Sequence, residues 1–176
     1  DFTKYEKSQK LKLIKTYDLI PAELNSKNKR YQFTDLDPNL RFNQYENSFN
    51  WLIDAGVALP VYNVTEFEIP LEASKKSNLF KLFLSDVGML TTCYGSSTVM
   101  SLLNNGKDIN CGALFENFVA QELTAHGFKT YYFNDKKHGE VDFLIEYKNH
   151  LLPIEVKSGK NYQTHSALTY FMSDKN

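Results

Sequence analysis

The segment GEVDFLIEYKNHLLPIEVK, residues 139–157, contains two strand-like runs joined by a short polar turn. Both runs are rich in β-branched, aromatic and other large apolar residues: Glu140–Tyr147 and Leu151–Lys157. They therefore predict two adjacent strands. Because side chains alternate between the two faces of a strand, Glu155 and Lys157 point the same way. The segment therefore predicts a β-hairpin with one polar face and one core face.

The length of the turn decides whether Asp142 joins that polar face. A turn with an even number of residues, such as Lys148-Asn149 or Asn149-His150, places Asp142 opposite Glu155 or Lys157. An odd number of residues directs Asp142 to the other face. With an even turn, two acids and one amine are expected to meet.

These three side chains have the chemistry that phosphodiester hydrolysis needs. Carboxylate oxygens are preferred ligands of Mg²⁺ and Mn²⁺, and a bound ion polarises the phosphoryl oxygen and lowers the pKa of a water ligand. We predict that Asp142 and Glu155 bind the metal and that Lys157 orients the water or stabilises developing negative charge. The structural alternative is a solvated cross-strand charge cluster that contributes little free energy.

A helix over residues 112–126 is predicted before these strands, with Gly127 ending it. Its apolar arc is formed by Leu114, Phe115, Phe118, Val119 and Leu123. Glu116 falls at the edge of this arc and is either an auxiliary metal or water ligand or a first-turn acid favoured by the helix dipole. Glu122 falls near the centre of the arc, where we expect a buried acid with a partner, because an unpaired carboxylate there is costly.

The first half of the chain predicts helices and a short hairpin. Bulky apolar residues at three- and four-residue steps predict a helix over Asn39–Asp54, and strands are predicted over Val57–Val64 and Leu79–Leu84. An earlier helix is expected to end before Pro21. The inner face of that helix is predicted to consist of Leu11, Ile14, Tyr17 and Leu19. Helices followed by a β-pair are typical of a winged helix, although the mixed charges of the helix over Asn39–Asp54 favour packing over DNA readout.

The polar stretch Asn104–Asn110 is rich in turn formers and predicts a boundary between a domain at residues 1–103 and a second at residues 104–176. Beyond it come the helix, a strand over Lys129–Phe133, the two hairpin strands and a last helix that starts near His165. The inner face of the last helix is assigned to Leu168, Phe171 and Met172. We therefore expect an α+β or α/β fold, with a winged-helix-like unit followed by an αβββα core.

Composition and charge restrict the classes of function. The chain has 176 residues, of which 42% are apolar and 14% aromatic, enough for a substantial core. Its formal net charge of -1 gives no global attraction to nucleic acid, so DNA binding needs a local patch. Cys93 and Cys111 form no CxxC pair, and the chain has no GxxxxGK[ST] phosphate loop and no apolar run long enough to span a membrane. We expect a cytoplasmic protein without an ATPase site in this segment and without a membrane partner.

The helix and hairpin resemble the PD-(D/E)XK nuclease superfamily, restriction-endonuclease-like proteins with a helical acid, an Asp on one strand and Glu-x-Lys on the next. The residues that match are Glu116, Asp142, Glu155 and Lys157. The whole chain is similar to the carboxy-terminal region, of unknown function, of a family of prokaryotic AAA-type P-loop ATPases. Four stretches carry that similarity: FKLFLSDVGML (80–90), GALFENFVAQEL (112–123), EVDF (140–143) and PIEVKSG (153–159).

The resemblance implies an amino-terminal ATPase domain that binds ATP, a winged-helix-like middle and a nuclease-like end. It assigns Mg²⁺ or Mn²⁺ to Asp142 and Glu155, with Glu116 as a further ligand and Lys157 as a catalytic residue. The sequence begins with Asp1 rather than Met, so we expect a piece of a longer protein, one that lacks a further strand of the superfamily. Expected partners are DNA, the ATPase domain and further copies in an oligomer. Two functions remain open: a metal-dependent nuclease, or a catalytically inactive DNA-binding, protein-interaction or regulatory module.

Overall fold

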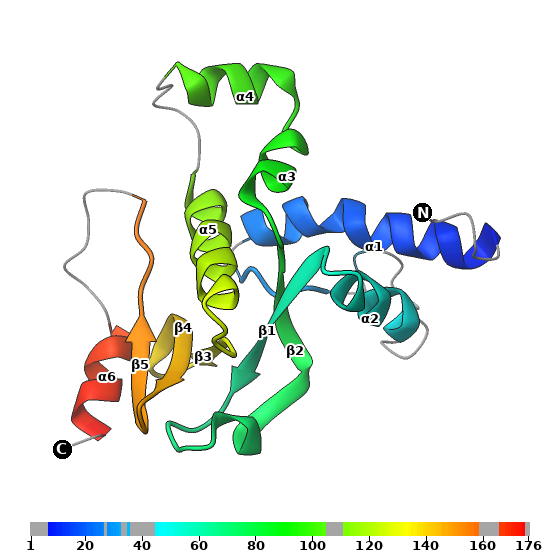
Figure 1. Cartoon of the computed structure of the whole chain (residues 1–176). Coiled ribbons are helices and arrows are strands. Elements are labelled where there is room, and N and C mark those ends of the chain that lie inside the picture. Colours follow the sequence, from blue (N-terminus) through cyan, green and yellow to red (C-terminus); the bar gives the residue numbers. More distant parts are fainter. Residues whose placement is uncertain are drawn as a thin grey trace.

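A computed structural model of the chain describes residues 7–26, 28–32, 35, 45–104, 111–158 and 166–174. These residues form a mixed α+β fold, the class that the sequence predicted, around a five-stranded sheet (Figure 1). The elements in chain order are α1 (Lys7–Asn25), α2 (Glu46–Asp54), β1 (Ala58–Val64), η4 (Leu71–Ser74), β2 (Lys75–Leu84), α3 (Val87–Thr92), α4 (Ser96–Leu103), α5 (Gly112–Ala125), β3 (Tyr131–Asp135), β4 (Gly139–Tyr147), β5 (His150–Ile154) and α6 (Ser166–Asp174).

The sheet has the strand order β2-β1-β3-β4-β5 and joins strands from both halves of the chain. β1 is antiparallel to β2 and parallel to β3, and β3, β4 and β5 follow as an antiparallel meander. The expected order of helix, three strands and helix is present as α5-β3-β4-β5-α6. Its sheet continues into the β1–β2 hairpin, whose strands precede the predicted boundary; residues 105–110 of that boundary lie outside the described residues.

Two apolar clusters hold the sheet between helices. Tyr132 belongs to the first cluster, together with buried residues of α1, α2 and α5. Tyr131 and Phe133, its neighbours along β3, belong to the second, together with Phe171 of α6. Because neighbours along a strand point to opposite faces, the two clusters lie on opposite sides of the sheet. The helices around α5 and the helix α6 therefore cover different faces (Figure 1).

The first helix continues through Pro21, before which it was expected to end. α1 contains Pro21 and ends at Asn25, so the expected end before Pro21 was wrong. Ile20 and Leu24 are fully buried on either side of the proline, and the Asn25 side chain donates a hydrogen bond of 2.8 Å to Pro21 O. Packing of these two apolar residues outweighs the loss of one helical hydrogen bond at the proline.

The inner face of α1 also differs from the expected one. Leu11 and Ile14 are 59% and 38% exposed, whereas Leu13 and Ile20 are buried. Apolar residues lie on more than one side of this helix, so spacing alone did not identify the side that meets the sheet.

The second helix and the two strands after it agree with their predictions in type. α2 covers Glu46–Asp54, and the part of the predicted helix over residues 39–44 lies outside the described residues. β2 starts at Lys75, before the predicted Leu79. At the end of the chain, Phe171 is buried in α6 as expected, but Met172 is exposed, so its assignment to the inner face was wrong.

Candidate functional site

A two-residue turn, Lys148-Asn149, joins β4 to β5. Both residues have positive φ, 49° and 61°, as in the type I′ turns that match the twist of a tight hairpin. The register pairs Phe143 with Ile154. The next pair along the hairpin therefore sets Asp142 opposite Glu155, which is the arrangement that an even turn requires.

The three predicted side chains are connected through Glu155. β5 ends at Ile154, so Glu155 and Lys157 lie beyond the strand that was predicted to contain them. Asp142 Oδ2 nevertheless accepts a hydrogen bond of 2.9 Å from Val156 N–H, which holds this segment against β4. Lys157 Nζ lies 3.2 Å from Glu155 Oε2.

A bulge in β4 directs Asp142 toward α5. Between the pairs Tyr131–Leu144 and Phe133–Val141, the register advances two residues along β3 and three along β4. The extra residue lies at Asp142 or Phe143, and bulges of this kind re-aim side chains.

Both of these β4 residues reach the same face of β2. The Asp142 carboxylate is 3.9 Å from Lys81 Nζ, and the rings of Phe143 and Phe83 are 5.6 Å apart. Because Lys81 and Phe83 are two positions apart in a strand, they share a face. Two consecutive residues of β4 therefore point to one side of the sheet, the side that α5 covers.

Lys81 is the main residue of the site that the sequence did not indicate. Its side chain is 0% exposed, and its ammonium lies among three carboxylates. The distances from Lys81 Nζ are 2.5 Å to Glu140 Oε1, 3.7 Å to Glu116 Oε2 and 3.9 Å to Asp142 Oδ1. A lysine inside an apolar strand usually faces solvent, and the acids of α5 and β4 account for its burial here, together with the Tyr132 ring 5.2 Å from Lys81 Nζ.

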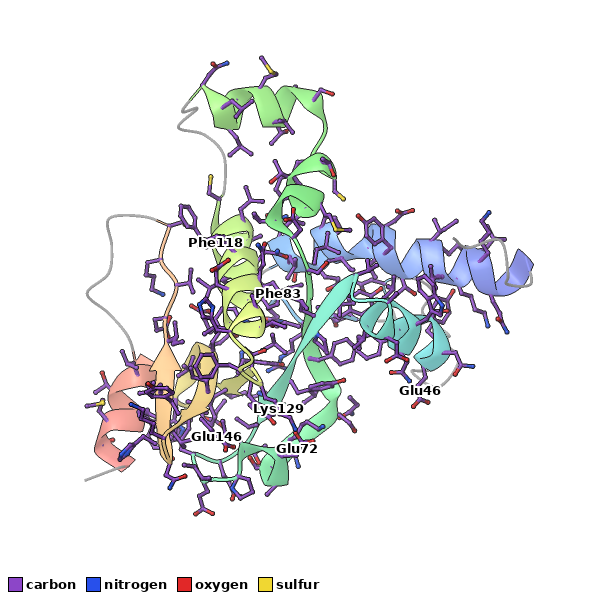
Figure 2. The ribbon with its side chains drawn as sticks, viewed as in Figure 1. Glu46, Glu72, Phe83, Phe118, Lys129 and Glu146 are labelled. Carbon is purple, nitrogen blue, oxygen red and sulfur yellow. The ribbon has the colours of Figure 1, made fainter. Side chains whose placement is uncertain are left out.

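Glu116 is the buried acid of α5, contrary to the expectation for Glu122. Glu116 is buried against Lys81 and also pairs with Lys29, whereas Glu122 is only partly buried. Phe115 and Phe118 are each 48% exposed, so their assignment to the apolar arc was wrong. The other three residues of the arc are partly buried against the first cluster: Leu114, Val119 and Leu123. Figure 2 shows Phe118 on the side of α5 away from Phe83 of β2.

Small residues explain which side of α5 faces the sheet. The buried residues of α5 are Ala113, Glu116, Asn117 and Ala120. The two alanines let the helix approach the strands closely, and the two polar residues find partners there. Asn117 exchanges two hydrogen bonds with the backbone of Leu84, and Gln121 accepts one from Val87 N–H at 2.9 Å.

Burial and crowding of the acids shift the pKa values of the site. Burial, the charge of Asp142 and a hydrogen bond with its side chain raise the pKa of Glu155 to about 7, against the pull of Lys157. Burial also raises the pKa of Glu116, and the repulsion from Asp142 adds to it, although Lys81 and Lys29 act in the opposite sense. These shifts mark a site in which negative charge is in excess near Asp142 and Glu155.

At Lys81, the charges of neighbouring groups outweigh the effect of burial on the pKa. Burial by itself lowers the pKa of an amine, but the charges of the three surrounding acids outweigh it and raise the pKa of Lys81. The ammonium therefore stays protonated at neutral pH.

The described residues contain no group of three or more Cys, His, Asp or Glu side chains that could hold a metal ion by itself. Glu116 directs its two oxygens to Lys29 and Lys81, so the carboxylates that remain for an ion are those of Asp142 and Glu155. Both already have partners in the chain: Asp142 contacts Lys81 and Val156 N–H, and Glu155 contacts Lys157. Mg²⁺ is commonly bound by one or two carboxylates together with substrate phosphates. The pair thus fits an ion that arrives with a phosphate substrate, not one held by a closed protein cage.

A separate pocket of about 280 Å³ is lined in part by Glu72, Lys129 and Glu146, whose side chains lie in the lower half of Figure 2. Its acids already have partners: Glu72 accepts a hydrogen bond of 2.6 Å from Tyr131 Oη, and Glu146 accepts one of 2.6 Å from Leu71 N–H. These bonds fasten the segment before β2 to β3 and β4.

Two protein families match different parts of the chain. One is described as a domain of unknown function (DUF8612) and matches residues 1–99, more than half of the 176 residues. The chain belongs to the DUF8612 family. A second family, described as a domain of unknown function (DUF4143), matches residues 111–175. No curated protein and no solved structure matches the chain.

The candidate site takes residues from both matched segments. The DUF8612 segment supplies Lys29 and Lys81, and the DUF4143 segment supplies the acids and Lys157. Among the helices described, none combines the length and apolar character needed to cross a membrane.

Proposed function

We propose that this member of the DUF8612 family carries a metal-dependent phosphodiesterase site that acts on nucleic acid, on DNA in preference to RNA. Asp142 and Glu155 bind the ion, and Lys157 is the catalytic amine. The observation that supports the proposal is that Asp142 accepts a hydrogen bond from Val156 N–H next to Glu155, whose Oε2 lies 3.2 Å from Lys157 Nζ. Two acids and an amine on one surface are the groups that phosphodiester hydrolysis uses.

A bound Mg²⁺ or Mn²⁺ would polarise the phosphoryl oxygen and make its water ligand more acidic. Val156 N–H holds the Asp142 carboxylate in place, and Glu155 loses its proton near pH 7, where it becomes available to a cation. Lys157 is 40% exposed and can reach from Glu155 to a substrate oxygen. In the reaction, the water oxygen forms a bond to phosphorus and the ester oxygen leaves with a proton.

We also propose that the site works beside a AAA-type ATPase domain of the same protein, in the cytoplasm. The DUF4143 match supports this link, because that family is usually found with AAA ATPases. ATP would bind to that other domain, since the present sequence has no GxxxxGK[ST] loop.

The second candidate function is a catalytically inactive binding or regulatory module that serves the ATPase domain. The Lys81 ammonium favours it, because it compensates Glu116, Glu140 and Asp142 without any metal. Because a lysine of the protein already balances the charge of these acids, the protein needs no divalent ion to stay folded.

Incubation of the purified chain with labelled duplex DNA and Mg²⁺ or Mn²⁺ tests the proposal. We expect nicking that disappears in Asp142→Ala and Lys157→Ala, while the exposed-site controls Asp54→Ala and Lys136→Ala retain it. Cleavage that survives both site substitutions contradicts the nuclease. DNA binding without cleavage supports the regulatory module, and the absence of both supports a role in protein interaction.

A further inference from the structure

Three carboxylates converge on the Lys81 ammonium from elements other than its own strand. Glu140 and Asp142 are alternate residues of β4, Glu116 belongs to α5, and Lys81 belongs to β2. Their nearest oxygens lie between 2.5 and 3.9 Å from Lys81 Nζ. The charge of Lys81 is therefore shared by three acids, of which Glu116 also pairs with Lys29.

Lys81 and Glu116 are closed to water, whereas the Glu140 side chain is 25% exposed. The Lys81 side chain is 0% exposed and that of Glu116 is 3% exposed. Glu116 Oε2 makes no hydrogen bond with any part of the chain that the structure describes, so its interaction with Lys81 is one of charge. Without the Lys81 ammonium, Glu116, Glu140 and Asp142 would face one another with the Lys29 ammonium at Glu116, and the remaining negative charge favours the uptake of a cation.

We propose that the Lys81 ammonium is a built-in cation that fills a second divalent-ion position, formed by Glu116, Glu140 and Asp142, beside the Asp142–Glu155 pair. The oxygens that surround Lys81 Nζ are the ligands that Mg²⁺ and Mn²⁺ prefer. As long as Lys81 occupies the position, no divalent ion can enter it.

The role of Lys81 adds a detail to the mechanism of the proposed nuclease. It rests on the proposed function, which places a divalent ion at Asp142 and Glu155. Sites with two ions a few ångströms apart clamp the attacking and leaving oxygens together. Here the second position supplies a fixed single charge, so the chain works with one divalent ion. Lys81 is a positioning residue, because it reaches the substrate only through the acids that it holds.

Counting bound Mn²⁺ by electron paramagnetic resonance compares the wild-type chain with Lys81→Ala. The alanine removes the ammonium and its stem, which leaves room for an ion. We expect Lys81→Ala to bind about one Mn²⁺ more per chain than the wild type, because Glu140, Asp142 and Glu116 Oε2 then lose the ammonium that they share, while Lys29 stays at Glu116 Oε1. The matched control is Lys81→Ala/Glu140→Gln, which removes one of the three carboxylates and should lose the additional ion.

An equal Mn²⁺ count in wild type and Lys81→Ala overturns the inference, and so does an additional ion that persists in the double variant. If Lys81→Ala is unfolded without metal, recovery of its near-ultraviolet circular dichroism on addition of Mn²⁺ supports the inference, and failure to recover at saturating Mn²⁺ overturns it. The proposed function fails separately: a wild-type chain that binds no Mn²⁺ rejects the Asp142–Glu155 site, while the difference between the two proteins still measures the role of Lys81.

Discussion

Asn117 pairs with one residue of the sheet, Leu84, through both ends of its side-chain amide. Asn117 Oδ1 accepts from Leu84 N–H at 2.8 Å, and Asn117 Nδ2 donates to Leu84 O at 2.9 Å. Both residues are fully buried. Because Glu116 precedes Asn117 and Lys81 lies three residues before Leu84, this pairing also sets the distance between the acid and the amine of the candidate site.

Asn117→Ala is expected to lower the free energy of unfolding by about 3 kcal/mol, because it leaves a buried N–H and a buried C=O without partners. The measurement is urea unfolding at pH 7. Gln121→Ala is the matched control on the same helix; it removes a single, partly buried hydrogen bond and should cost about 1 kcal/mol. Equal losses in the two variants would show that the double pairing is not important.

Lys81→Met is expected to lower the free energy of unfolding by about 3–5 kcal/mol, because methionine fills the space of the stem but removes the ammonium that the buried acids Glu116 and Asp142 share with Glu140. Lys75→Met provides the comparison, since the Lys75–Glu72 pair lies at the surface and should contribute less than about 1 kcal/mol. Urea unfolding in the presence of a chelator measures both. A loss for Lys81→Met as small as that for Lys75→Met contradicts the charge assignment.

The affinity of the wild-type chain for Mn²⁺ is expected to rise as the pH increases through about 7, where Glu155 loses its proton. A proton and a metal ion compete for the same carboxylate, so deprotonation favours the metal. Titration calorimetry between pH 6 and pH 8 checks this, with the glutamine substitution Glu155→Gln as the control that should remove the rise. An affinity that is the same across this range would argue against Glu155 as a ligand.

Glu23 gives a pH dependence of stability away from the candidate site. Burial first, and then the charge of Asp35 and a hydrogen bond with its side chain, raise the pKa of Glu23 from 4.5 to about 7. The folded chain thus binds this proton more tightly than the unfolded chain does. The resulting stability is fully present below pH 4.5 and is lost as the pH rises through about 7.

Glu23→Gln should therefore gain stability relative to the wild type as the pH rises from 5 to 8. Melting temperatures of both proteins across this interval measure the effect. Asp18→Asn, which changes an exposed acid of the same helix, is the control and should follow the wild type. If Glu23→Gln also follows the wild type, Glu23 titrates alike in the folded and unfolded chains.

Local sequence determines the hairpin half of the candidate site. Alternation along the strands restricts the hairpin to two arrangements, and the two-residue turn seen in the structure selects the one with Asp142 opposite Glu155. The order of α5, β3, β4, β5 and α6 is likewise visible in the change of apolar period from helix to strand and back.

Contacts between distant segments leave no such local signal. Lys81 looks like a solvent-facing lysine within the strand-like run 80–84, because its counter-charges come from α5 and β4. On α5 itself, size and not hydrophobicity selects the inner face: Ala113 and Ala120 face the sheet, while Phe115 and Phe118 remain partly exposed. The bulge that re-aims Asp142 depends on its pairing with β3 and is equally hidden in the sequence.

The parallel pairing of β1 with β3, over Tyr62–Val64 and Tyr131–Phe133, makes the DUF8612 and DUF4143 segments share one backbone ladder. A chimera that took one segment from this protein and the other from a relative would have to form the β1–β3 pairing between strands of different origin. Its lysine at position 81 would also have to pair with acids that come from the other parent. Successful recombinants are therefore expected to inherit both segments from a single parent.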